Sequence, residues 1–213
     1  DVPLDIVLLQ DETGSMSDDI ETLRRLAPEI WNSLTDMAQA GFRMSVVGFR
    51  DFARSPWGDA GDWVYRLIHD FTTSKDEFVT AVNELTASGG NDTPESQYVA
   101  LYYAVTPSHP CIDSNGDEDC SDANDTPPGQ QPSFRTGAKR IILLATDAPF
   151  HDPEDTSGYP GPTRDTVVNA LRPTNTTIIG LVPGGAGRIP EVDDLATATG
   201  GSVQNTGASG QDV

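Results

Sequence analysis

Short, almost wholly apolar runs recur along the chain and alternate with longer amphipathic segments. Runs of this kind are typical of strands that are covered on both faces, as in a parallel sheet. Four of them have the length of a strand: 4–9, 43–49, 140–145 and 177–182. The segment 63–68 alternates more and favours an antiparallel edge strand, and a weak last strand is expected around Ser202 and Val203.

Apolar residues at three- and four-residue spacing predict helices between these strands. The longest pattern runs from Ser17 to Ala40, opens on acidic residues that suit a helix N-terminus, and contains Pro28, which would kink or divide the helix. Further helices are expected over 74–87, 94–105, 163–171 and 190–199. The alternation predicts one α/β domain over residues 1–213, with a doubly wound, mostly parallel central sheet flanked by helices.

One segment, at about 106–138, does not fit this alternation. It is rich in Pro, Asp, Asn and Gly and has no apolar periodicity, so we interpret it as an insertion or a functional loop. Because it follows a helix and precedes a strand, we expect it at the end of the sheet opposite the carboxyl ends of the strands. Cys111 and Cys120 lie in it, nine residues apart, and a disulfide in an oxidising compartment is favoured over two free thiols.

The composition adds a strong negative charge. The net charge is −20, and 24 of the 33 acidic residues are Asp. Such a surface repels nucleic acid and anionic lipid and attracts cations. A salt-adapted or GC-rich source and calcium-dependent life outside the cell would each explain it. No run approaches the roughly 18 apolar residues that span a bilayer, so no membrane insertion is expected. A start at Asp1 without a signal-peptide pattern indicates a piece of something longer.

Oxygen-bearing side chains follow the predicted parallel strands. Asp11, Thr13 and Ser15 follow the first strand, and Asp51 and Asp147 follow two later ones. Ligands of open α/β sheets bind beyond the carboxyl ends of the strands, where these side chains should lie together. Carboxylates and hydroxyls suit Mg²⁺, Mn²⁺ or Ca²⁺ and not zinc. Since two of the first three donors are uncharged hydroxyls, a bound cation would stay electrophilic and could take a carboxylate from outside.

These residues carry a family resemblance. Asp-x-Thr-x-Ser after an apolar first strand, with Thr-Asp after a later one, resembles the metal-ion-dependent adhesion site (MIDAS) of von Willebrand factor type A domains. The likeness covers nearly the whole chain and is nearest to the I-like domain of integrin β subunits, so we expect a prokaryotic, adhesin-like relative with a Rossmann-like fold. It implies Mg²⁺ or Mn²⁺ at a MIDAS formed by Asp11, Thr13, Ser15, Glu95 and Asp147.

The resemblance also implies two flanking calcium sites. Asp18 and Asp19 match the acidic pair of the adjacent site, although acidic residues in a first helical turn also compensate the helix dipole. The third site is matched by Asp51, Asp92, Glu95 and the carbonyl of Pro94.

Two positions depart from the integrin pattern or leave it open. Asn91 is one position off the asparagine of the integrin pattern. Thr93 could supply a hydroxyl to the metal, and Glu95 would then contact the metal-binding residues and not the metal itself. We interpret His151 as packing beside the site, because a lone histidine is more often structural than catalytic. No terminal helix is recognisable, so no integrin-like signalling is expected.

The acidic insertion carries side-chain oxygens at every second position, in Asp113, Asn115, Asp117 and Asp119. This spacing resembles the first half of a calcium loop of the EF-hand kind, and an acidic disordered loop is the alternative. Its expected place opposite the main site argues against a part in ligand capture.

The leading functional hypothesis is an extracellular or cell-surface adhesion module, without enzymatic activity, that binds a carboxylate-bearing partner through the metal. A calcium-stabilised structural segment of a large surface protein is the alternative. A metal-dependent phosphoester hydrolase is less favoured, because no phosphate loop and no clear general base are present.

Overall fold

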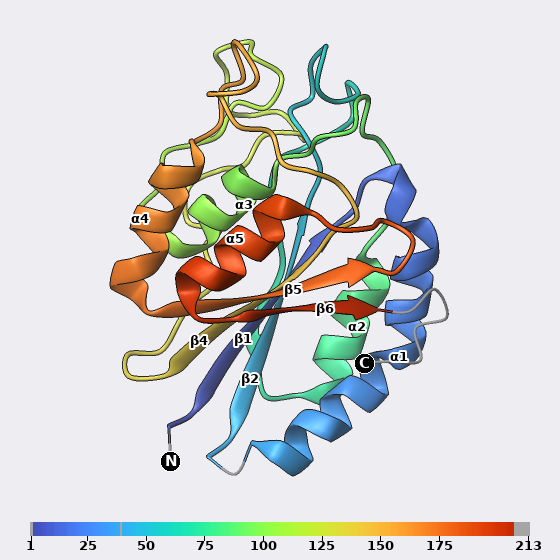
Figure 1. Ribbon diagram of the computed structural model, residues 1–213, viewed down its shortest axis with the longest axis vertical. Helices are drawn as coiled ribbons and strands as arrows, with labels where there is room; N and C mark the ends of the chain where they lie inside the picture. The colour runs from blue at the N-terminus through green and yellow to red at the C-terminus, as the bar shows by residue number, and fades with distance from the viewer. Residues whose placement is uncertain (1, 39, 207–213) are drawn as a thin grey trace.

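A six-stranded sheet lies between two groups of helices in the computed structural model, which describes residues 2–38 and 40–206 (Figure 1). The strand order is β3-β2-β1-β4-β5-β6, and all neighbours are parallel except β3, which is antiparallel to β2. The expected doubly wound, mostly parallel sheet is therefore confirmed. The strands are β1 (Leu4–Asp11), β2 (Phe42–Phe49), β3 (Arg66–Thr72), β4 (Lys139–Ala145), β5 (Thr176–Pro183) and β6 (Ser202–Thr206).

The helices follow the predicted alternation. Pro28 lies inside α1, which runs through it undivided and ends at Met37, earlier than expected. A 3₁₀ turn, η1 (Gly14–Met16), joins β1 to α1. The helices are α1 (Ser17–Met37), α2 (Lys75–Glu84), α3 (Gln97–Val105), α4 (Arg164–Thr174) and α5 (Pro190–Thr199). No helix in the described part of the chain is long and apolar enough to cross a bilayer.

The edge strand begins later than the alternation predicts. It pairs with β2 as the antiparallel edge that we expect, but it starts at Arg66 and not at Trp63. Trp63, Val64 and Tyr65 are buried in the core before the pairing begins. These residues are apolar because they pack in the core and not because they pair in the sheet. A sequence pattern does not distinguish the two cases.

The central strand β1 is enclosed on both faces. Its Val7 and Leu9 belong to the core under α3, α4 and α5, while Ile6 and Leu8 belong to the core under α1 and α2. This is the arrangement that a continuous apolar run predicts. Because β1 lies between β2 and β4, its carboxyl end lies near the middle of the row of strand ends.

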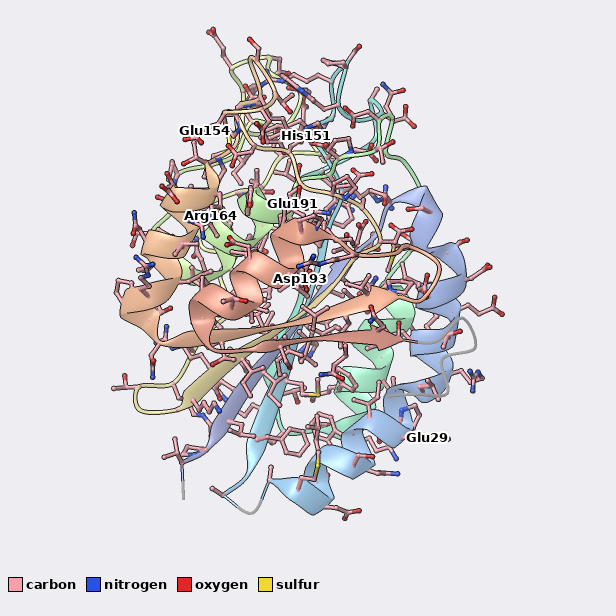
Figure 2. The ribbon with its side chains drawn as sticks, in the orientation of Figure 1. Glu29, His151, Glu154, Arg164, Glu191 and Asp193 are labelled. Atoms are coloured by element: carbon pink, nitrogen blue, oxygen red, sulfur yellow. A yellow bond between two sulfur atoms is a disulfide. The ribbon has the colours of Figure 1, made fainter. Side chains whose placement is uncertain are left out.

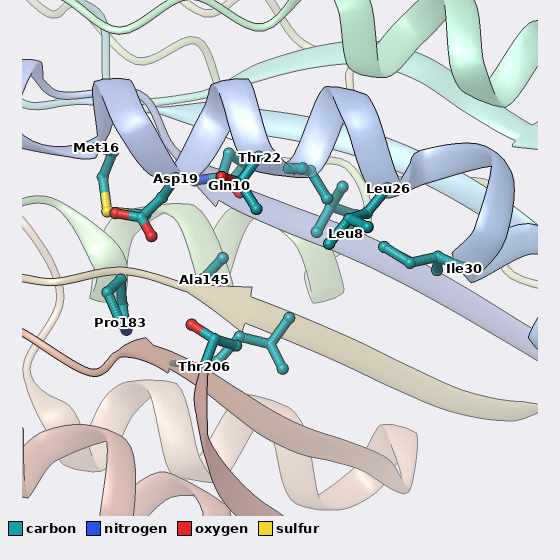
Figure 3. A pocket seen from close by; sticks show the side chains of 12 residues that line it. Leu8, Gln10, Met16, Asp19, Thr22, Leu26, Ile30, Ala145, Pro183 and Thr206 are labelled. Carbon is teal, nitrogen blue, oxygen red and sulfur yellow. The ribbon is translucent and has the colours of Figure 1, made fainter. Parts of the chain in front are cut away.

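The strands β4 and β5 are covered less evenly. In β5 buried residues alternate with half-buried ones, and Leu181 is among the half-buried ones. Leu181 and Leu143 line an apolar groove against Leu23 and Leu26 of α1, and Figure 3 shows the part of this groove nearest Met16. The expectation of strands covered on both faces thus holds fully for β1, whereas on the α1 side of β4 and β5 residues such as Leu143 and Leu181 are only half-buried.

The acidic insertion lies where we did not expect it. After α3 it runs up to the loops at the carboxyl ends of the strands before the chain continues into β4 (Figure 1). There the backbone N–H of Ala53 donates to Ser114 Oγ at 3.3 Å, and Thr126 Oγ1 donates to the carbonyl of Tyr65 at 2.7 Å. The prediction of the opposite end was wrong, since chain order alone does not tell where a long loop finds hydrogen-bond partners. The predicted disulfide between Cys111 and Cys120 is confirmed.

Candidate functional site

The turn after β1 is organised by its own aspartate. Asp11 ends the strand with a fully buried side chain, and its Oδ1 accepts the backbone N–H of Thr13 at 2.9 Å and the Thr13 hydroxyl at 2.7 Å. These contacts bend the chain back over the strand end. The N–H of Gly14 donates to the carbonyl of Gly89 at 3.1 Å, which joins this turn to the loop before α3. Ser15 follows on the exposed side.

The loop after β4 completes this group. Ser15 Oγ donates to Asp147 Oδ1 at 2.9 Å, and Thr13 Oγ1 lies 3.4 Å from Ser15 Oγ. Thr146 Oγ1 donates to Asp11 Oδ2 at 2.7 Å. Asp11, Thr13, Ser15 and Asp147 therefore meet between the ends of two adjacent strands; we call them the Asp11 group.

Glu95 borders this group. Its side chain is buried, and its Oε2 accepts no hydrogen bond from any described residue. Gly90 has a positive φ of 72° and lies between Glu95 and Thr13. A Cβ at Gly90 would lie 2.9 Å from Glu95 Oε1 and 3.2 Å from Thr13 Cβ, so only a glycine lets these residues approach one another.

Backbone pairing brings Glu95 and His151 to the same place. The N–H of Glu95 donates to the carbonyl of Pro149 and the N–H of His151 donates to that of Glu95, both at 3.0 Å. A short bridge between Glu95 and Phe150 results. The loop before α3 is thereby fastened to the loop after β4.

A second group consists of Asp51, Asp92 and His151; we call it the Asp51 group. His151 Nε2 lies 3.1 Å from Asp51 Oδ2 and 3.2 Å from Asp92 Oδ1. The ligand atoms of the three side chains all lie within 4.8 Å of one another, and among the described residues this is the one such group of three or more His, Cys, Asp or Glu side chains. Figure 2 shows His151 among the loops at the carboxyl ends of the strands.

Neighbouring donors orient Asp51. Its Oδ1 accepts hydrogen bonds from Ser96 Oγ and the N–H of Phe52, both at 2.6 Å, and from the Tyr159 hydroxyl at 3.3 Å. The Tyr159 ring also stacks on His151, with the ring centroids 4.4 Å apart. Oδ2 accepts no hydrogen bond from the described residues and faces the imidazole.

Burial and crowding of carboxylates raise several pKa values here. Burial raises the pKa of Asp11 to about 6. Burial, and then the charges of Asp11, Asp51 and Asp92, raise the pKa of Glu95 to about 11. Burial also raises the pKa of Asp92, which the imidazole offsets in part. For His151, burial lowers the pKa, but Asp51 and Asp92 more than compensate, so the pKa is raised. Protons or cations are therefore strongly favoured at this end of the sheet.

The donors of the Asp11 group fit a divalent cation. They are hydroxyls and carboxylates, the oxygen ligands that Mg²⁺ and Mn²⁺ accept. Glu95 adds a buried carboxylate oxygen without a hydrogen-bond partner, which is an unusual state for a native protein unless an ion or water satisfies it. Which of these side chains bind the metal directly stays a prediction.

The other candidates of the predicted flanking sites are less enclosed. Asp18 is exposed and Asp19 half-buried in the first turn of α1. Burial, then Asp147 and Asp18, raise the pKa of Asp19, so its carboxylate lies within electrostatic reach of the Asp11 group. Pro94 is half-buried. Two alternatives from the sequence, Asn91 and Thr93, are exposed, and Asn91 Nδ2 donates to the carbonyl of Pro56 at 2.8 Å.

The acidic insertion already uses its carboxylates. Asp113 accepts the backbone N–H groups of Gly116 and Glu118, and Asn115 and Asp117 each accept a backbone N–H two residues later. These contacts form a folded loop and not a disordered one. Whether it also binds calcium remains a prediction.

One functional candidate and one buried acid escaped the sequence analysis. His151, which we interpreted as packing, faces both carboxylates of the Asp51 group. Its position in the segment after β4, only four residues beyond Asp147, was the available signal. Glu12 is buried under the turn, where burial raises its pKa to about 7. Nothing in the local pattern distinguishes it from an exposed turn residue.

Solved structures share this fold. Two structures of proximal thread matrix protein 1 from the mussel byssus align with TM-scores of 0.57 and 0.55, at 17% and 16% identity. Each alignment covers 96% of this chain and 44% of the mussel chain, so this chain spans less than half the length of those proteins. No curated protein sequence matches the chain.

The sequence itself matches one family model, that of the von Willebrand factor A domain, over residues 5–114. The match includes β1 with its turn, Asp51 and the loop that carries Glu95. Domains of this family act generally in protein interaction and adhesion. The chain belongs to the von Willebrand factor A domain family.

Proposed function

We propose that the chain is a metal-dependent recognition module in which the Asp11 group, with Glu95 beside it, holds Mg²⁺ or Mn²⁺ and the cation binds a carboxylate of a partner protein. One observation carries the proposal. Two buried carboxyl groups, Asp11 and Glu95, lie beside hydroxyls at a sheet edge, and Glu95 Oε2 has no hydrogen-bond partner among the described residues.

The surroundings of the group are asymmetric. Asp11, Thr13 and Glu95 are buried, whereas Ser15 is exposed and Asp147 half-exposed. A cation held here would be enclosed by the protein on one side and open to solvent on the other. Because Thr13 and Ser15 contribute no charge, the cation would keep part of its positive charge for an external anion.

The partner and the location follow from charge and chemistry. A net charge of −20 opposes nucleic acid and anionic lipid, so a protein that presents a carboxylate to the cation is the partner favoured here. The Cys111–Cys120 disulfide supports an extracellular or cell-surface location, within a larger surface protein. We assign no catalytic step, because the histidine at this end faces Asp51 and Asp92 and not the Asp11 group.

The proposal is tested with acetate as a minimal carboxylate. In the presence of Mn²⁺ and the full chain, the methyl protons of acetate should show enhanced relaxation, since acetate would enter the coordination of the paramagnetic ion. Acetamide, which is similar in size but uncharged, should show little enhancement. EDTA should remove the effect.

Ser15→Ala is the matched variant, because Ser15 is exposed and the change leaves the core untouched. It should weaken Mn²⁺ binding and the acetate effect together, while Ser17→Ala, a neighbouring exposed serine, should change neither. Tight Mn²⁺ binding without any acetate effect would favour a metal-stabilised structural segment. Metal-dependent turnover of a phosphoester, lost in Asp147→Ala, would favour the hydrolase.

A further inference from the structure

The Asp51 group differs chemically from the calcium site that the family resemblance implies. That site would be built from oxygen atoms of Asp51, Asp92, Pro94 and Glu95. In the structure an imidazole nitrogen, His151 Nε2, instead faces the two aspartates at 3.1 and 3.2 Å. Calcium takes six to eight oxygen ligands and does not favour nitrogen, so the residues present do not fit the calcium expectation.

We infer that Asp51, Asp92 and His151 form a separate site for a transition-metal ion, which binds Zn²⁺ more tightly than Mn²⁺ and does not bind Ca²⁺. Imidazole with carboxylates is a donor set for such ions, and affinity for a given nitrogen and oxygen site rises from Mn²⁺ toward Zn²⁺. The inference does not depend on the proposed function, because it concerns other side chains.

The spacing of the donors fits one small cation. Ligands at about 2.1 Å from a metal lie about 3.0–3.4 Å from one another at octahedral to tetrahedral angles. The distances from His151 Nε2 to the two carboxylate oxygens fall in this range. The site therefore requires little rearrangement when a metal replaces a proton on Nε2.

The carboxylate of Asp51 is oriented for metal binding. The side chain is fully buried, and three donors, from Ser96, Phe52 and Tyr159, all bind its Oδ1. Oδ2 accepts no hydrogen bond from the described residues and points at the imidazole. Metal-binding carboxylates are typically oriented in this way, with one oxygen held by neighbouring donors.

The imidazole is held just as firmly. His151 is buried and stacks on Tyr159, and its second nitrogen, Nδ1, lies 3.5 Å from Thr156 Oγ1. A proton on Nδ1 can be directed to that hydroxyl, which leaves the Nε2 lone pair for a metal. Asp92 is part-exposed, so water can reach the site and supply a further ligand.

Calorimetry of the full chain in excess Mg²⁺ tests the inference, because Mg²⁺ occupies oxygen sites such as the Asp11 group. Zn²⁺ should then bind one site, and His151→Asn should weaken it at least tenfold. His109→Asn, a histidine outside the group, should leave Zn²⁺ affinity within about twofold, as should Ser15→Ala. Ca²⁺ should not compete for the site.

Anomalous scattering at the zinc edge from crystals of the wild-type chain provides a readout that does not depend on the folding of a variant. A peak between Asp51, Asp92 and His151 is expected. Zinc absent from this position, or equal Zn²⁺ affinity in wild type and a folded His151→Asn chain, would overturn the inference. In that case the imidazole itself is the cation that balances the two aspartates.

Discussion

Asp11 ends β1 and Asp51 follows the neighbouring strand β2, and both side chains are fully buried, but their surroundings differ. Asp11 is joined to Thr13 and Thr146, with the exposed Ser15 beside them. Asp51 instead faces the buried imidazole of His151. An aspartate at a strand end is thus part of an open, hydroxyl-rich group in the case of Asp11. In the case of Asp51 it is part of an enclosed group with a nitrogen donor. The first arrangement suits exchange of an external ligand, and the second suits selection of a metal.

Removal of Asp51 should have the largest effect on stability. Asp51→Ala leaves a buried imidazole without its closest carboxylate and removes the acceptor of three donors, which should cost about 3–5 kcal/mol in the free energy of unfolding. Asp147→Ala, in the open group, should cost less than about 1 kcal/mol. Urea unfolding in EDTA compares the two. Equal losses would mean that the two groups do not differ in enclosure.

The pH dependence of the metal-free chain should be unusual. Glu95, Asp11, Glu12 and His151 all have raised pKa values, so the folded chain binds more protons than the unfolded chain above about pH 4. Stability should therefore fall as the pH rises from 5 to 8, on the order of a few kcal/mol. The lowered pKa of Asp5 has the opposite sign, but it acts only below about pH 4.

Thermal unfolding in EDTA and in Mg²⁺ across this range measures the effect. Mg²⁺ should flatten the dependence, because the cation replaces protons on the Asp11 group. If the free energy of unfolding in EDTA instead rises from pH 5 to 8, the pKa values of these closely spaced carboxyl groups are not raised.

Metal addition should separate the two groups directly. At a Mg²⁺ concentration of 100 times its Kd, the wild-type chain should gain about 2.7 kcal/mol. Ser15→Ala should lose most of this gain, whereas His151→Asn should keep it. Calorimetric melting of the three chains at fixed Mg²⁺ is the measurement, and a gain lost in His151→Asn but retained in Ser15→Ala would reverse the assignment.

The acidic insertion should show the smallest effect. Asp117 is exposed, and its Oδ1 already accepts the N–H of Asp119. With Ca²⁺ present, Asp117→Asn should change the Tm by less than about 2 °C, the equivalent of roughly 0.5 kcal/mol. A larger fall in Tm that occurs only in the presence of Ca²⁺ would instead support the calcium loop that the sequence suggests.

Local spacing made part of the site predictable. Thr13 contacts Asp11 two residues away, so the turn itself brings them together. The meeting of Ser15 with Asp147 spans 132 positions, yet it was expected, because both follow parallel strands that are adjacent in the sheet. Ligand sites in such sheets lie beyond the carboxyl ends of the strands, and this general rule does not depend on individual side chains.

The sequence by itself determined the sheet, its helices and the hydroxyl-rich turn after β1, because apolar periodicity and short-range hydrogen bonds suffice for these. Only the tertiary structure decided that His151 faces Asp51, 100 positions away, since that contact depends on the bridge between Glu95 and Phe150. It also decided the return of the acidic insertion to the same end of the sheet, through Ser114 and Ala53. Long loops carry no periodic signal, so their hydrogen-bond partners become known only when the whole chain is folded.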